Sequence, residues 1–297
     1  MMPRILASLL LLLPVFSAAS GSRNDEKPYD RKEVEAKLKQ ILVGKVAVMQ
    51  QFYREHELHF DSYGNLVGTA KIGPWTAYGR VEIATAKLGD KTLLLTGKRN
   101  VMRWEGTEMG NYTLDDDEVR ITIDLPPNPS GNAISATLAK IFLFRAQRLS
   151  DIVPEYWKDF LTTERSRSAQ WQQRQAEMLK DVKNVGDDVK PPKLLSKANS
   201  IEIGPAPFKD VNAETVTLQF IVDPSGSVKD VQITKPVGAG ADDPVAEVIE
   251  QWKFEPATSS AGPVSVLMYA KRLIRFEKQQ GMPLHPCPLA TDASVCQ

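Results

Sequence analysis

Cysteine and histidine are scarce in this chain of 297 residues, which has two Cys and three His. Metal sites built from these ligands need more of them at defined spacings. No Ser/His/Asp or Cys/His set suited to nucleophilic catalysis stands out either. The sequence therefore indicates no catalytic residues, no metal site and no cofactor, and we do not expect an enzyme.

An excess of charge of one sign is also absent, because 37 Lys and Arg residues balance 37 Asp and Glu residues. Nucleic acids and anionic lipids attract proteins that carry a net positive charge. This balance argues against both as electrostatic partners. After the first 20 residues no run is long and apolar enough to span a membrane. We therefore expect no nucleic-acid partner and no membrane span in the mature chain.

The one long apolar run lies in residues 1–20. Arg4 supplies a positive charge, residues 5–16 are mostly apolar, and residues 17–20 are small side chains of the kind that a signal peptidase reads. This pattern predicts a cleaved signal peptide and a mature chain that begins near Ser20. An uncleaved anchor is the alternative, but a spanning helix needs about 20 apolar residues and this run is shorter.

Both cysteines, Cys287 and Cys296, lie in the C-terminal tail, residues 279–297. Exported proteins reside in an oxidising space in which cysteines pair. We therefore predict a disulfide between them. A metal site is the alternative, but His285 is the one nearby histidine and the set lacks ligands.

Residues 30–161 have the pattern of an α+β domain. A helix is predicted after Asp30, where apolar residues recur at helical spacing. From there to Leu125 the pattern is β, with a hairpin at Gly89-Asp90. Another helix is predicted over residues 133–145. We expect a mainly antiparallel sheet with flanking helices.

A second domain is predicted in residues 194–278, after a polar linker of residues 162–193. Two strands surround the turn at residues 223–226, where Pro and Gly suit a tight turn. A helix begins at Asp243-Pro244 because these residue types favour a helix start. A long final strand covers residues 264–276.

The stretch EQWKFEPA, residues 250–257, ends this helix. Trp252 lies on the same helix face as Val245 and Ile249, so that face is expected to be buried. Aromatic side chains can each bury about 150–250 Å². We predict that Trp252, Phe254 and Pro256 form a structural lock between the helix end and the strands.

Four segments resemble the C-terminal domain of the TonB family: VTLQFIVDPSGSVKDVQITKP, DDPVAEVIEQW, KFEPA and the strand after Gly262-Pro263. The resemblance covers about residues 191–276. It implies a small α+β unit with a helix on one face of two or three strands. It also implies a periplasmic or secreted protein of the bacterial cell envelope, with an envelope protein as partner. In energy-transducing members of the family, outer-membrane transporters are such partners, and a segment of the transporter is added to a sheet edge.

The final strand is the predicted partner-binding edge. Its first half has no charge and no proline, whereas Lys271, Arg272 and Arg275 protect its second half from indiscriminate pairing. The predicted partner-binding residues are Val264, Ser265, Val266, Leu267, Met268, Tyr269 and Ala270. The alternative is that the linker or the C-terminal tail covers this edge.

Two further functions are considered. A small-ligand or lipid-binding protein would hold a hydrophobic cavity inside the N-terminal sheet. An enzyme would hold a clustered polar pocket with perturbed titratable groups. The segment HELH, residues 56–59, has a histidine spacing of three rather than the i, i+4 spacing of helical metal sites, so we expect solvated residues there.

Overall fold

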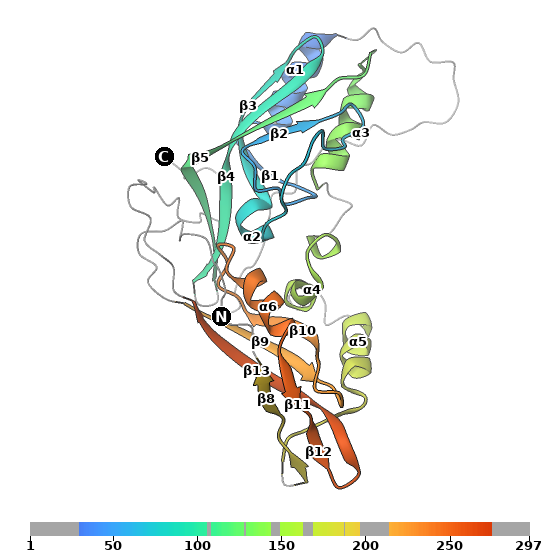
Figure 1. The fold of residues 1–297 in the computed structure, drawn as a ribbon. Helices are drawn as coiled ribbons and strands as arrows, with labels where there is room; N and C mark the ends of the chain where they lie inside the picture. The colour runs from blue at the N-terminus through green and yellow to red at the C-terminus, as the bar shows by residue number, and fades with distance from the viewer. Residues whose placement is uncertain are drawn as a thin grey trace, which may run out of the picture. The chain divides into compact units, whose positions relative to one another are not determined.

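The computed structural model describes residues 30–105, 108–127, 129–143, 149–162, 169–186, 188–196 and 214–274. The chain forms two compact units (Figure 1). Of the described residues, the first contains those up to Met102 and those from Met109 to Leu143, and the second contains those from Arg103 to Glu108 and from Leu149 to Ile274. Both contain helices and sheets, so the predicted α+β class is confirmed. The predicted signal peptide and the pair Cys287 and Cys296 lie outside the described residues and stay predictions.

A five-stranded sheet forms the first unit, in the order β1-β3-β4-β5-β2. Its strands are β1 (Lys45–Val48), β2 (Glu57–Phe60), β3 (Arg80–Leu88), β4 (Thr92–Glu105) and β5 (Glu108–Asp124). β3 pairs antiparallel with β1 and β4, as expected. The edge strand β2 instead runs parallel to β5. A parallel neighbour needs a long connection, and here the chain supplies one by passing through β3 and β4.

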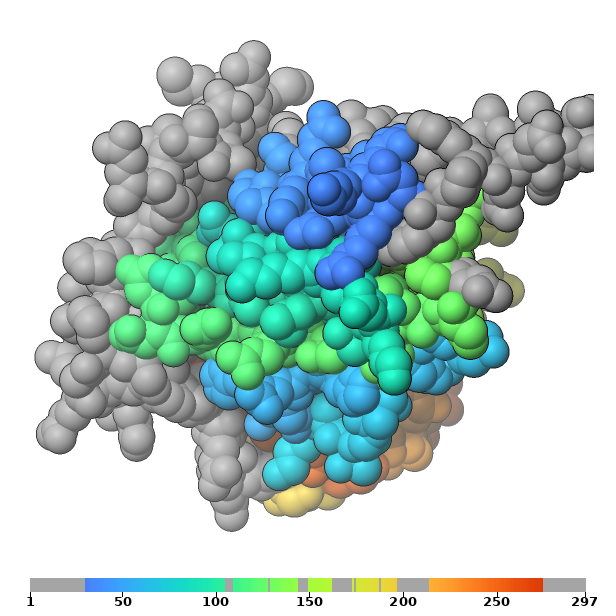
Figure 2. Space-filling view, turned by 90° about the horizontal axis from the view of Figure 1, so that it is seen from above, coloured from blue at the N-terminus to red at the C-terminus, as the bar shows by residue number. Residues whose placement is uncertain are grey.

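Two helices cover the core of this sheet. α1 (Arg31–Leu42) begins where the Asp30 carboxylate accepts the N–H groups of Lys32 and Glu33. This cap satisfies N–H groups that have no partner inside the helix. α1 packs against β3, and in the view of Figure 2 its blue residues border the teal ones. A short helix, α2 (Trp75–Tyr78), precedes β3.

The second helix, α3 (Gly131–Ile141), begins after Ser130, whose hydroxyl accepts the N–H of Ala133. It ends earlier than the predicted residue 145, because Phe142 is extended and forms a β-bridge with Met49. Both helices and the sheet share one hydrophobic core. Fully buried members include Leu42, Met49, Ile83, Leu95, Ile121, Leu138 and Phe142.

The second unit is built on the sheet β10-β9-β13-β12-β7. These strands are β7 (Val189–Lys190), β9 (Glu214–Val222), β10 (Val228–Lys235), β12 (Ala257–Ser259) and β13 (Gly262–Ile274). β6 (Val182–Lys183) also pairs with β13, and β8 (Lys193–Ser196) pairs with β11 (Lys253–Glu255). The hairpin β9–β10 and the long β13 therefore lie where the sequence predicted strands.

The domain boundary differs from the one expected at residue 161. A short 3-10 helix (Leu149–Asp151), α4 (Glu155–Thr162) and α5 (Ala169–Leu179) belong to the second unit. Much of the expected linker is also structured, because β6 and β7 pair with β13 and β12. A polar segment joins a sheet through its backbone, and side-chain composition does not reveal this.

The helix α6 (Asp242–Glu250) buries Val245 and Ile249 against the second sheet. Trp252 and Phe254 follow it and are 8% and 6% exposed. Their ring centroids lie 6.3 and 6.0 Å from that of Phe220 on β9. The Phe254 N–H donates to the carbonyl of Gly226 at 2.8 Å, so the segment after the helix is fixed to the hairpin turn.

Candidate functional site

The long strand β13 is bound to the sheet along one edge. It pairs antiparallel with β9 from Val266, opposite Val222, to Ile274, opposite Glu214. A partner strand could pair with β13 only along the edge that faces away from β9, provided that this edge is free. Whether it is free depends on the direction in which each backbone N–H and C=O group of β13 points.

Two hydrogen bonds set this direction on β9. The Asp223 N–H donates to the Ser227 carbonyl at 2.9 Å, and the Thr217 carbonyl accepts the Thr234 hydroxyl at 3.1 Å. Odd-numbered residues of β9 therefore direct their backbone groups toward β10. Because these groups alternate along a strand, even-numbered residues such as Val222 direct theirs toward β13.

The alternation carries over to β13 through the register of Val266 with Val222. Even-numbered residues of β13 face β9, and odd-numbered residues face the opposite edge. The outward residues are Leu267, Tyr269, Lys271 and Leu273. The parallel pairing of Val266 with Lys183 engages the outward N–H of Leu267, and among the described residues no strand pairs with this edge beyond it.

The beginning of the predicted partner-binding edge is already occupied. Val264 pairs with Ala257 of β12, and β6 runs parallel to Ser265 and Val266. Val264, Ser265 and Val266 are therefore not available, which corrects the expected range. Leu267, Met268, Tyr269 and Ala270 remain beside the unpaired edge. The alternative that the linker covers part of this edge holds for its first residues.

Side chains along β13 divide between two faces. Val266 and Ile274 are buried on the α6 side, where the Arg272 guanidinium lies 5.9 Å from the centre of the Trp252 ring. On the opposite face Tyr269 is 63% and Leu273 is 59% exposed, with Lys271 exposed between them. Leu273 was not among the predicted partner-binding residues, because the neighbouring charges indicate protection of the whole second half of the strand. Tyr, Lys and Leu at alternate positions were the available signal.

Buried carboxylates lie at the start of α6. Asp242 is fully buried and accepts the N–H groups of Val237 at 2.7 Å and Gly238 at 2.6 Å. Burial and the nearby Asp243 raise the pKa of Asp242 to about 8, although the two N–H groups act in the opposite direction. Asp243 accepts the indole N–H of Trp157 from α4. These contacts join α4 and α6. The two pockets described next are not lined by Asp242 or Asp243.

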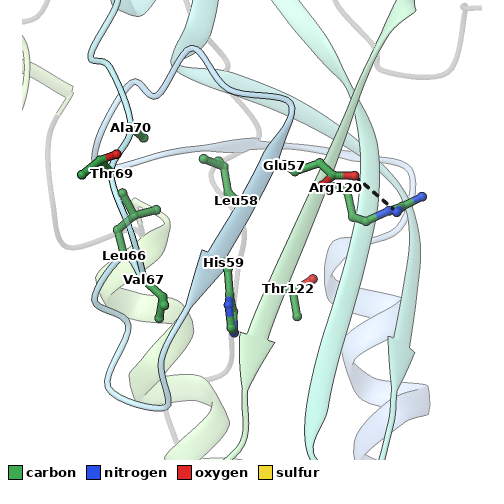
Figure 3. Close-up of a pocket in the computed structure, with 9 residues that line it drawn as sticks. All are labelled: Glu57, Leu58, His59, Leu66, Val67, Thr69, Ala70, Arg120 and Thr122. Carbon is green, nitrogen blue, oxygen red and sulfur yellow. Dashed lines mark hydrogen bonds and ion pairs between the residues drawn. The ribbon is translucent and has the colours of Figure 1, made fainter.

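Two of the surface pockets lie in the first unit. One, of about 310 Å³, lies between β2, β5 and residues 66–70 (Figure 3). Its wall carries the ion pair of Glu57 with Arg120, and His59 and Thr122 lie on the two neighbouring strands. The other, of about 290 Å³, is lined by Tyr53, Phe60 and Lys140, among others. Neither of these two is a hydrophobic cavity inside the sheet.

A buried polar cluster in the first unit surrounds Arg99. Its guanidinium donates to the carbonyls of Tyr78, Tyr53 and Glu55 at 2.7–2.9 Å. Burial lowers the pKa of Arg99, and burial raises the pKa of the nearby Asp117. Neither surface pocket is lined by these two residues. Arg99 therefore holds three backbone segments together, which is a structural role.

The histidines of HELH are exposed, as expected for solvated residues. His56 lies 3.2 Å from a carboxylate oxygen of Asp117, and His59 lies 2.9 Å from one of Asp124. Within the described ranges, no three His, Cys, Asp or Glu side chains are grouped so that they could hold a metal ion. In the same part of the chain, no helix is long and apolar enough to cross a membrane.

Comparison with curated proteins finds no match for this chain. Comparison with protein families gives a match for the C-terminal part of the chain, which contains β9, β10, α6 and β13. Residues 213–277 match the family described as Gram-negative bacterial TonB protein C-terminal, so the predicted resemblance is confirmed for this part of the chain.

Proposed function

We propose that this protein is a partner-binding module of the bacterial cell envelope, which takes up an extended segment of another envelope protein at the outward edge of β13. TonB C-terminal domains are interaction domains that contact outer-membrane proteins, and residues 213–277 match them. The observation that carries the proposal is the edge itself. From Tyr269 to Leu273 its outward backbone groups have no strand partner among the described residues.

The physical basis of the proposal is that unpaired backbone groups on a strand edge are available to hydrogen-bond with a second strand. An exposed strand edge presents N–H and C=O groups that form a template for another strand. In strand addition these groups supply affinity, and alternate side chains supply specificity. The outward groups of Tyr269, Lys271 and Leu273 meet this requirement. β6 limits the site at Ser265 and Val266, so the incoming segment would lie beyond it.

The same proposal places the mature protein outside the inner membrane. Residues 1–20 would be removed as a signal peptide, which N-terminal sequencing of the exported protein tests. Cys287 and Cys296 would pair there, and intact-mass measurement with alkylation before and after reduction would show it. Two thiols that react without reduction would contradict the pairing.

Proline substitution tests the edge. Tyr269→Pro removes an outward N–H, while Tyr269→Ala removes the side chain and keeps that donor. Proline is tolerated on a strand edge where its missing N–H faces solvent. We expect Tyr269→Pro to abolish capture of the partner from envelope extract and Tyr269→Ala to weaken it only moderately.

A matched pair at Lys271 repeats the test two residues along. Circular dichroism must show that all four variants are folded. Capture by both proline variants at the level of the unmodified protein would contradict binding through this edge. A photo-reactive residue at position 273 should label the same partner, which identifies it by mass spectrometry.

A further inference from the structure

One row of side chains borders the outward edge of β13: Tyr269, Lys271 and Leu273, called the outer row below. Successive members are two residues apart and therefore point to the same face of the sheet, about 7 Å from one another. All three are exposed. Single exposed apolar residues are ordinary, but here two large ones flank one lysine beside an unpaired edge.

We propose that the outer row selects an extended peptide with an acidic residue between two apolar residues at alternate positions. This inference rests on the proposed strand addition and specifies its partner. A strand added beside β13 would place its own side chains directly opposite this row. Opposed aromatic and aliphatic residues attract, and so do opposed charges, whereas like charges repel.

The neighbours of the outer row on β9 supply no negative charge. Tyr269 lies opposite Gln219, Lys271 opposite Thr217 and Leu273 opposite Thr215. The Lys271 ammonium forms no ion pair with any described residue. A carboxylate on the incoming strand is therefore the complement that this position lacks. Apolar residues two positions before and after it would cover Tyr269 and Leu273.

The outer row also argues against a second copy of this chain as the occupant. Two copies of β13 related by a two-fold axis would pair antiparallel, and the register that places Tyr269 opposite Leu273 also places Lys271 opposite Lys271. The two apolar pairs would fit, but the central pair would bring two ammonium groups together. Lys271 thus acts against self-pairing in this register and in favour of an acidic partner.

The length of the recognised segment follows from β6. Because β6 occupies the edge at Ser265 and Val266 and engages the N–H of Leu267, an added strand is confined to the part of β13 beyond Leu267. The described part of β13 ends at Ile274, so this segment is short. Its central residue would lie opposite Lys271.

Charge exchange between protein and peptide tests the proposal. The probes are labelled peptides Thr-Val-Thr-Glu-Thr-Val-Thr, the same peptide with Gln at the centre, and the same with Lys. Binding to the mature protein is measured by fluorescence anisotropy in low and high salt. We expect the Glu peptide to bind best, about two- to five-fold tighter than the Gln peptide, with a preference that salt weakens.

The variant Lys271→Glu should reverse the order, so that the Lys peptide binds best, while Lys271→Gln should abolish the preference. Reversal cannot come from simple loss of structure. Equal binding of all three peptides that is lost in Tyr269→Pro would overturn the proposed selection and leave strand addition standing. If Tyr269→Pro leaves the binding of the peptides unchanged, both the proposed selection and strand addition are contradicted. A concentration-dependent dimer of the unmodified protein that Tyr269→Pro dissociates would show a second copy as the occupant and overturn the proposal.

Discussion

At the start of α6, Asp242 combines full burial with two short backbone hydrogen bonds. Its carboxylate satisfies N–H groups of the loop at Val237 and Gly238 that would otherwise lack partners. The cost is a buried ionisable group beside a second acid, Asp243. The result is a pKa of about 8, well above the ordinary value of 3.8.

The raised pKa makes the second unit sensitive to pH. A group whose pKa is higher in the folded state stabilises that state while it is protonated. The contribution of Asp242 is therefore complete below about pH 4 and is lost as the pH rises through about 8. Asp242→Asn removes this titration. The free energy of unfolding of the unmodified protein, relative to that of the variant, should fall between pH 4 and 8.

Chemical denaturation at several pH values and constant ionic strength measures this difference. Comparing the two proteins cancels the titration of the other carboxyl groups. Parallel curves over that range would show that Asp242 does not titrate as its surroundings indicate.

Trp252 tests the predicted lock. It lies just beyond α6, and its ring packs against Phe220 and Phe254. Truncation of a large buried aromatic side chain costs about 3–5 kcal/mol, and a typical domain has only about 5–15 kcal/mol in total. Trp252→Ala should therefore unfold or greatly loosen the second unit and leave the first folded. Thermal melts should show loss of one transition. Two unchanged transitions would mean that Trp252 does not support the fold.

At the scale of elements, α4 and α6 meet through Trp157 and Asp243. Trp157 is fully buried, and its indole N–H donates to the Asp243 carboxylate. Trp157→Phe keeps an aromatic ring and removes this donor. Hydrogen bonds that involve charged groups contribute about 1.5–3 kcal/mol, so we expect a loss of this order from the second unit. Denaturant midpoints measure it.

Asp243→Asn is the matched control, because its amide oxygen can still accept the indole N–H. It should cost less than Trp157→Phe. Equal stability of Trp157→Phe and the unmodified protein would show that this hydrogen bond contributes little.

Elements with strong local signals could be predicted. Asp223 and Gly226 identified the β9–β10 turn, where Gly226 has φ +80° and a Cβ would lie 1.9 Å from the Phe254 carbonyl oxygen. The Asp223 carboxylate accepts the N–H groups of Ser225 and Ser227. The spacing of Val245 and Ile249 likewise identified the buried face of α6.

Elements that depend on distant partners could not be predicted. β6 has two residues, Val182 and Lys183, in a polar segment without periodicity. It is a strand because it pairs with backbone groups of β13. This pairing closes the first part of the candidate site and leaves the rest of the edge open. The assignment of α4 to the second unit likewise depends on its contacts with β10 and on Trp157 meeting α6, and spacing alone gives no direction for these contacts.

At the scale of the whole molecule, the second unit includes residues far from its family match. Arg103 and Trp104 belong to it although they lie at the end of β4. The Trp104 N–H donates to the Val237 carbonyl at 2.8 Å, and the Arg103 guanidinium lies 3.2 Å from the Glu214 carboxylate. A chain restricted to residues 213–277 would lack these contacts.

Trp104→Ala measures how much the family-matched region depends on them. The Trp104 ring is 6% exposed, stacks on Trp157 at 5.6 Å and meets the edge of Phe160 at 5.5 Å. Removing it should cost about 3–5 kcal/mol, because a cavity replaces a large buried ring. The backbone bond to Val237 can persist, so the loss should come from the ring.

Hydrogen exchange followed by mass spectrometry should show faster exchange in β10 and α6. Ile121→Ala, in the core of the first unit, is the control and should speed exchange in β3 and β5 instead. Unchanged exchange in β10 and α6 of Trp104→Ala would show that the TonB-like region is stable without the strand end that reaches it.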